Sequence, residues 1–190
     1  MNNDIESVDS HSGINRVRRL EDREEAMFFD LVKLGVGYLA NNFPAYYTRE
    51  QSIDEFLAPL ITQADRRIRN VFIAEMLIHP EYSSKVPAVL KRLRRQDQSL
   101  MKLLYSTAVF LQKKYRAELE VFLLKNWQDL PDLYSTKLIR TLSSSPNDNL
   151  WLIGKEYQLQ TGELIDWPEV CDHLVRQLLK RQDLFSRGVL

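Results

Sequence analysis

The spacing of apolar residues is the feature that most constrains the fold of this chain. From about residue 21 to residue 185, apolar side chains recur three and four positions apart, which is the period of an amphipathic α-helix. No segment alternates convincingly between apolar and polar residues, as a half-buried strand would, and only 6 of the 190 residues are glycine. The pattern predicts an all-α fold of seven or eight helices.

Length and composition predict one domain with a polar extension. A chain of 190 residues with 44% hydrophobic residues is long enough to bury a full core. Residues 1–19 lack apolar anchors, so we expect a disordered or weakly docked tail. Residues 20–190 are expected to form a single compact helical domain. A bundle and a short helical-repeat-like stack both fit, and no repeated residue pattern requires the stack.

Local signals predict several helix boundaries. Ser52–Glu55 and Asp166–Glu169 each have the form of a capping box, Ser84 is placed to cap the helix after it, and Gly162 marks a helix end. The polar run 143–149 predicts a loop.

Two predicted helical segments are apolar enough to lie in the interior. The helix from about Ala64 to His79 is apolar nearly all round in its second half. Residues 97–127 form a long helical stretch, as one helix or two, and residues 100–111 within it are densely apolar.

Charge is unevenly distributed although it sums to zero. Residues 1–62 carry 6 basic and 11 acidic side chains, residues 63–116 carry 12 and 4, and residues 117–190 carry 8 and 11. We call residues 63–116 the basic island. Phosphate, an acidic protein surface and the chain's own acidic segments are all suitable counter-charges. A pI near 6.8 argues against a dedicated polyanion binder, so any nucleic-acid role would rest on this local surface.

Nine basic residues on three predicted helices are the candidate partner-binding surface: Arg66, Arg67, Arg69, Lys85, Lys91, Arg92, Arg95, Lys113 and Lys114. If these helices are neighbours, the side chains converge on one positive surface. The favoured alternative is a solvated face whose charges pair with the chain's own acids, namely Glu21, Glu24, Glu25, Asp54 and Glu55.

The predicted helix that begins near Ser84 is the most clearly amphipathic. At 100° per residue, one of its faces is apolar and consists of Val86, Val89, Leu90 and Leu93. The opposite face is basic and carries Lys85, Lys91, Arg92 and Arg95.

Aromatic residues are the second candidate for partner contacts. Phe43, Tyr46 and Tyr47 crowd one short connection and are candidate anchors, because exposed aromatic side chains dominate protein interfaces. A second group lies in the C-terminal third: Trp151, Tyr157 and Trp167. Packing in the core is the favoured use of both groups.

No motif predicts catalysis. Glu75 and His79 share a helical face, but two ligands do not make a metal site, and a structural pair or a histidine that ends a helix is favoured. Cys171 and His173 point about 200° apart on a helix, so they cannot form a nucleophile–base pair. Neither a phosphate-binding glycine loop nor a nucleophile elbow is present in the sequence. We expect no cofactor and no metal.

Cysteine usage and apolar runs indicate the compartment. Cys171 is the single cysteine, which is typical of a reducing compartment, and we expect it to be a buried small hydrophobe. The first twenty residues resemble neither a signal nor a transit peptide, and the longest apolar runs are too short to span a bilayer. A cytoplasmic protein without membrane attachment is expected.

These observations favour a non-enzymatic interaction protein, such as an adaptor or regulatory subunit, that uses the basic island to hold an acidic partner. The alternative is a nucleic-acid-binding accessory protein that uses the same helices, and a small helical enzyme comes third. A salt series separates the first two, because nucleic-acid affinity falls steeply with salt. The oligomeric state is left open.

Overall fold

The structure is a computed structural model, and it describes residues 52–138 and 142–186. The chain divides into two units, residues 1–50 and 51–190, and the described residues all belong to the second. The predicted tail of residues 1–19 therefore lies outside the described residues, as do the candidate anchors Phe43, Tyr46 and Tyr47.

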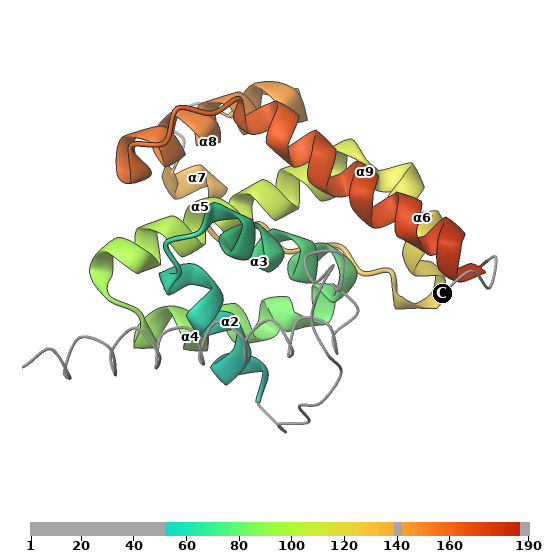
Figure 1. Cartoon of the computed structure of the whole chain (residues 1–190), viewed down its shortest axis with the longest axis horizontal. Coiled ribbons are helices and arrows are strands. Elements are labelled where there is room, and N and C mark those ends of the chain that lie inside the picture. Colours follow the sequence, from blue (N-terminus) through green and yellow to red (C-terminus); the bar gives the residue numbers. More distant parts are fainter. Residues whose placement is uncertain (1–51, 139–141, 187–190) are drawn as a thin grey trace, which may run out of the picture. The chain divides into compact units, whose positions relative to one another are not determined.

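The described residues contain eight α-helices, two 3-10 helices and no strand, which confirms the predicted all-α class (Figure 1). In chain order the elements are α2 (Ile53–Thr62), α3 (Arg66–Ile78), η2 (Pro80–Lys85), α4 (Val86–Arg92), α5 (Arg95–Lys114), α6 (Arg116–Leu123), η3 (Leu124–Asn126), α7 (Ser135–Leu138), α8 (Pro146–Thr161) and α9 (Trp167–Ser186).

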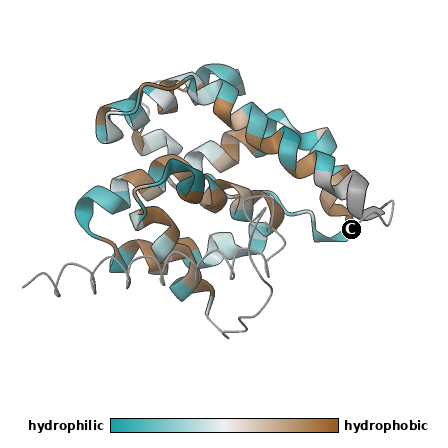
Figure 2. Cartoon of the chain, viewed as in Figure 1, coloured by the Kyte–Doolittle hydropathy of each residue, from teal (hydrophilic) through white to brown (hydrophobic). Residues whose placement is uncertain are grey.

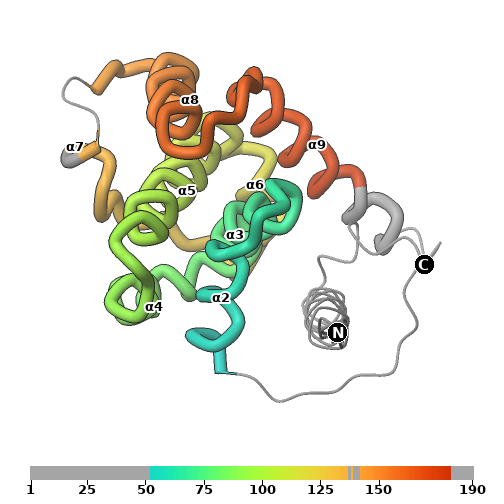
Figure 3. The backbone as a smooth tube through the Cα atoms, turned by 60° about the vertical axis from the view of Figure 1, so that its left-hand side comes forward, coloured from blue at the N-terminus to red at the C-terminus, as the bar shows by residue number. Residues whose placement is uncertain are grey.

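Helix α5 is the centre of this unit. It touches every other α-helix of the described residues, and it runs between α8 on one side and α3 on the other (Figure 3). Residues 103–112 are all buried, as expected for a helix that is apolar nearly all round. In a helical-repeat stack each unit contacts only its neighbours. The arrangement is therefore a bundle around a central helix.

Helix α3 is the second interior helix, as its apolar sequence predicts. Residues 68–77 are all buried, and they include the ionisable side chains of Arg69 and Glu75. Figure 2 shows the general pattern, in which apolar residues face the neighbouring helices and polar residues face outward. Because charges are costly to bury without a partner, the surroundings of these two side chains are of functional interest.

Several predicted helix ends are confirmed by their hydrogen bonds. The Ser52 hydroxyl accepts from the Glu55 amide, and the Glu55 carboxylate accepts from the Ser52 amide, which completes the capping box of α2. Gly162 ends α8 in the left-handed conformation, with a φ of 75°. The Glu169 amide donates to the Asp166 carboxylate at 3.1 Å at the start of α9.

Two expectations about helix starts are wrong. Ser84 does not cap α4, because it lies within η2, and the N-cap residue Lys85 makes no side-chain cap. The predicted loop 143–149 is half helix, since Ser145 caps α8 and Pro146 occupies its first position. Proline and N-capping residues serve equally in turns and in first helical turns, so composition alone misplaced this boundary.

Helices α8 and α9 approach each other closely at Gly154. A Cβ atom at this position would lie 2.5 Å from the Cβ of Trp167. The Trp167 ring stacks on Tyr157 with 4.2 Å between ring centroids, and its indole N–H donates to the Thr107 hydroxyl of α5 at 3.2 Å. This contact joins α5, α8 and α9, and it positions the α8–α9 loop that carries Glu163.

Candidate functional site

The nine candidate basic residues divide by whether folding brings a carboxylate to them. Six have a carboxylate within 4 Å: Arg66, Arg67, Arg69, Arg92, Lys113 and Lys114. The other three are exposed and form no ion pair with any described residue: Lys85, Lys91 and Arg95.

The first turn of α3 carries three arginines and no acid, although cations are unfavourable at the positive end of a helix dipole. Asp65, the N-cap residue, accepts from the Arg67 amide at 2.8 Å and lies 2.7 Å from the Arg67 guanidinium. Hydrogen bonding from Arg67 holds the pKa of Asp65 below its ordinary value. Asp65 therefore neutralises Arg67, and the charges of Arg66 and Arg69 are balanced by a different acid.

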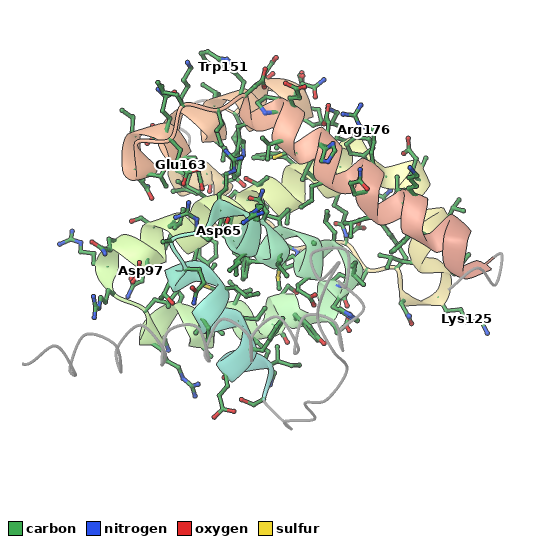
Figure 4. The ribbon with its side chains drawn as sticks, in the orientation of Figure 1. Asp65, Asp97, Lys125, Trp151, Glu163 and Arg176 are labelled. Carbon is green, nitrogen blue, oxygen red and sulfur yellow. The ribbon has the colours of Figure 1, made fainter. Side chains whose placement is uncertain are left out.

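Arg66 and Arg69 share the carboxylate of Glu163, which Figure 4 places above α3 in the α8–α9 loop. Arg69 is 7% exposed and pairs directly with Glu163 Oε1. Arg66 lies 3.7 Å from Glu163 Oε2. Burial raises the pKa of Tyr157 to about 12, so its hydroxyl keeps its proton and donates to Glu163 Oε1 at 3.4 Å. We call Arg66, Arg69 and Glu163 the arginine clamp.

The C-terminal end of α5 is neutralised in a similar way. The Lys114 ammonium lies 2.6 Å from the Asp172 carboxylate of α9, and the Lys113 ammonium lies 3.8 Å from Asp132. Both lysines are in the last turn of α5, where the helix dipole favours a cation. The Lys114–Asp172 pair also ties α5 to α9, so these two lysines have a structural role.

Four exposed cations surround the sharp turn between α4 and α5: Lys91, Arg92, Arg94 and Arg95, which we call the α4–α5 corner. Within the described residues a single ion pair reaches this corner, between Arg92 and Asp54 at 3.8 Å. Figure 4 shows nitrogen-tipped side chains that project outward from this end of α5, beside Asp97. Within the described residues, the corner therefore groups four exposed cations of the basic island around one carboxylate.

A buried apolar face supports the corner from below. Val86, Val89 and Leu93 are buried, and Leu90 is half-buried, as the amphipathic pattern predicts. Leu93 is 8% exposed and lies at the turn itself, between the two pairs of cations. The corner is therefore held to the core by aliphatic packing, and its charged groups are not needed to hold it there.

Of the five acids expected to neutralise the basic island, two lie within the described residues. Asp54 does pair with Arg92, whereas Glu55 completes the α2 capping box. The other three expected partners lie outside the described residues: Glu21, Glu24 and Glu25. Within the described residues, the island also pairs with six acids that were not expected: Asp65, Glu120, Asp129, Asp132, Glu163 and Asp172. Glu163 is 94 positions from Arg69 in the sequence, and no local pattern signals such a pair.

Glu75 and His79 do not form a pair. His79 is the C-cap residue of α3, and its Nδ1 lies 3.2 Å from a carboxylate oxygen of Glu81. Glu75 is fully buried, and among the described residues neither of its carboxylate oxygens has a hydrogen-bond partner. Burial, with a contribution from the charge of Glu81, raises the pKa of Glu75 to about 8. The carboxyl group is therefore mostly protonated at pH 7.

Cys171 and His173, the remaining chemical candidates, differ in burial. Cys171 is buried, and burial raises the pKa of its thiol well above the ordinary value, so the thiolate is disfavoured. His173 is exposed. No group of three or more potential metal ligands occurs among the described residues. Over the same residues, no helix has the length and apolarity needed to cross a membrane.

A hollow between α8 and the start of α9 was not indicated by the sequence. Its volume is about 310 Å³, and Trp151 at its edge is 54% exposed, with the Lys155 ammonium 5.1 Å from its ring centroid. The hollow is lined by Trp151, Gly154, Lys155, Gln158, Ile165, Asp166, Trp167 and Pro168. Of the C-terminal aromatic group, Tyr157 and Trp167 are buried in the core, whereas Trp151 is not.

Comparison with known proteins identifies no relative: the chain matches no protein-family model, no curated protein and no solved structure. The function therefore has to be argued from the geometry of the described residues. On that basis the α4–α5 corner is the candidate binding surface.

Proposed function

We propose that this chain is a non-enzymatic helical interaction protein that holds an acidic peptide or protein surface at the α4–α5 corner. One observation carries the proposal: the four cations of the corner are exposed and, within the described residues, share a single carboxylate, at 3.8 Å. Such a surface has a positive potential that steers and orients a negatively charged partner.

The size of the surface favours a carboxylate-rich partner over a nucleic acid. Proteins that bind duplex DNA through its backbone commonly engage about 6–10 phosphates. Six cations of the basic island already face the chain's own acids at other places: Arg66, Arg67, Arg69, Lys113, Lys114 and Arg116. The four cations of the corner suit a short acidic segment.

Charge reversal at the corner tests the proposal. Replacement of Lys91, Arg92 and Arg95 together by Glu leaves the buried apolar face of α4 untouched. The matched control reverses three exposed cations elsewhere, Lys125, Arg176 and Lys180, and so changes the net charge equally. The probes are a fluorescein-labelled polyglutamate decamer and a labelled single-stranded oligonucleotide, each followed by fluorescence anisotropy across a salt series.

We expect the unmodified chain and the control to bind polyglutamate, and the corner variant to lose at least tenfold in affinity. Binding of the oligonucleotide alone, lost in the corner variant, would overturn this proposal in favour of the nucleic-acid alternative. Equal binding of polyglutamate by all three proteins, or no binding by any, would also overturn it.

A further inference from the structure

The arginine clamp contains more positive charge than its single carboxylate neutralises. Arg66 and Arg69 contribute two charges, and Glu163 contributes one. The positive end of the α3 dipole adds to the excess, while Asp65 is engaged by Arg67. The two arginines would match the charge of a dianion if Glu163 were displaced.

Hydrogen bonding in the clamp is also incomplete. A guanidinium group has five N–H donors, and the Nε atoms of Arg66 and Arg69 are both buried without an acceptor. Arg69 is more than nine-tenths buried, so water cannot readily serve as the missing acceptor for its Nε–H. Buried donors without acceptors are rare and costly. A ligand with more acceptor positions than one carboxylate would satisfy them.

Glu163 lies in the short loop between α8 and α9, outside both helices. It follows Gly162, which ends α8 in the left-handed conformation. The next residue, Leu164, is 82% exposed and anchors nothing. Arg66 and Glu163 are themselves partly exposed, with side-chain values of 33% and 29%. Displacement of the Glu163 carboxylate would take an acceptor from the Tyr157 hydroxyl, but Glu163 takes no part in the stacking of the Tyr157 and Trp167 rings.

We infer that Arg66 and Arg69 form a phosphate-binding site at the start of α3 and that Glu163 is its internal occupant, which a phosphate group displaces. Phosphate has the charge to match both arginines and enough oxygens to accept from both guanidinium groups. The start of a helix is a favourable position for such an anion. The site is separate from the α4–α5 corner in sequence and in its elements.

Competition with Glu163 supplies the test. Inorganic phosphate is titrated into the full chain by calorimetry, with sodium chloride of equal ionic strength as the blank. Glu163→Gln removes the internal competitor, and we expect phosphate to bind about tenfold more tightly than to the unmodified chain. Asp172→Asn is the matched control, because it removes the carboxylate of another partly buried ion pair. It should leave phosphate affinity unchanged.

Two further variants assign the bound phosphate to the clamp. Arg66→Gln keeps the direct Arg69–Glu163 pair and should weaken phosphate binding about tenfold. This variant tests the phosphate site even if Glu163→Gln does not fold. The triple corner variant should bind phosphate as the unmodified chain does. Equal phosphate affinity in the unmodified chain, Glu163→Gln and Arg66→Gln would overturn the inference. Loss of phosphate binding in the corner variant, or no binding by any of these proteins, would do the same.

Discussion

The first turn of α3 and the α4–α5 corner are both short basic segments, yet their charges have different surroundings. In α3, Arg69 is 7% exposed and pairs with a carboxylate from the α8–α9 loop. At the corner, Arg94 and Arg95 are exposed, and they form no ion pair with any described residue. The local sequences are similar in composition, so composition is not what separates a structural charge from an available one.

The two regions differ in how far their cations are exposed to solvent and in whether a carboxylate from a distant part of the sequence reaches them. A buried cation loses hydration, and a specific partner has to compensate, so removal of either member is costly. An exposed cation keeps its hydration and contributes little to stability. Charges in α3 are therefore balanced by the chain's own carboxylates, which a ligand would have to displace, whereas most charges at the corner have no such competitor among the described residues. Five measurements test this contrast, and their expected effects decrease from Glu75 to Arg94.

The largest effect is expected from Glu75, the buried acid of α3 that lacks a partner. Its pKa is about 8 in the folded protein, against 4.5 for an ordinary glutamate. The folded state therefore holds a proton that the unfolded state releases between these values. The contribution of Glu75 to stability is fully present below pH 4.5 and is lost as the pH rises toward 8, by about 1.4 kcal/mol per pH unit at most.

Urea denaturation of the unmodified chain and of Glu75→Gln between pH 5 and pH 8 measures this contribution. The difference between the two proteins isolates Glu75 from other groups that titrate in the same range. Parallel stability curves would show that the carboxyl group is not held in its neutral form.

Arg69→Ala should be the most destabilising change among the cations, by about 3 kcal/mol. The variant removes the buried member of the arginine clamp and leaves Glu163 without its direct partner. The free energy of unfolding, from urea titration at pH 7, is the measurement. A loss below about 1 kcal/mol would mean that Arg69 belongs with the exposed cations of the corner.

Gly154→Ala tests the close approach of α8 and α9, the two helices that flank the loop of Glu163. The added Cβ would lie 2.5 Å from the Cβ of Trp167, so α8 and α9 must separate. Overpacking of this kind costs about 2 kcal/mol. Thermal denaturation of Gly154→Ala should show a lower midpoint. Gly162→Ala is the comparison: nothing lies within 4 Å of the added Cβ, so its only cost is the positive φ of the backbone. An unchanged midpoint for Gly154→Ala would contradict the close approach of α8 and α9.

Asp172→Asn should have an intermediate effect, a loss of about 1 kcal/mol. The Lys114–Asp172 pair is short, at 2.6 Å, but both side chains are partly exposed, at 20% and 28%. Solvent therefore screens part of the attraction. Addition of 1 M sodium chloride should reduce the difference between the unmodified chain and the variant, and a difference that grows with salt would contradict an electrostatic role.

Arg94→Ala should have the smallest effect, a change within about 0.5 kcal/mol. Arg94 is exposed and precedes α5 as its N-cap residue without a side-chain cap. The midpoint of urea denaturation is the measurement. A loss comparable to that of Arg69→Ala would remove the contrast between the two regions and, with it, the reason to regard the corner as free for a partner.

Local features of this protein were predictable because their causes lie within a few residues. The Ser52–Glu55 capping box and the Gly162 helix end depend on backbone donors and dihedral angles nearby. The burial of residues 68–77 and 103–112 follows from their nearly continuous apolar character. Misplaced boundaries arose where one residue type serves two roles, as Pro146 does.

The sequence by itself determined the helical class, most helix positions and which segments enter the core, because period and capping are properties of neighbouring residues. Only the tertiary structure decided which cations are neutralised. An ion pair requires two side chains to meet in space, and those of Arg69 with Glu163 and Lys114 with Asp172 join residues 94 and 58 positions apart. The α4–α5 corner is exposed for the same reason: within the described residues, the fold brings it one carboxylate for four cations.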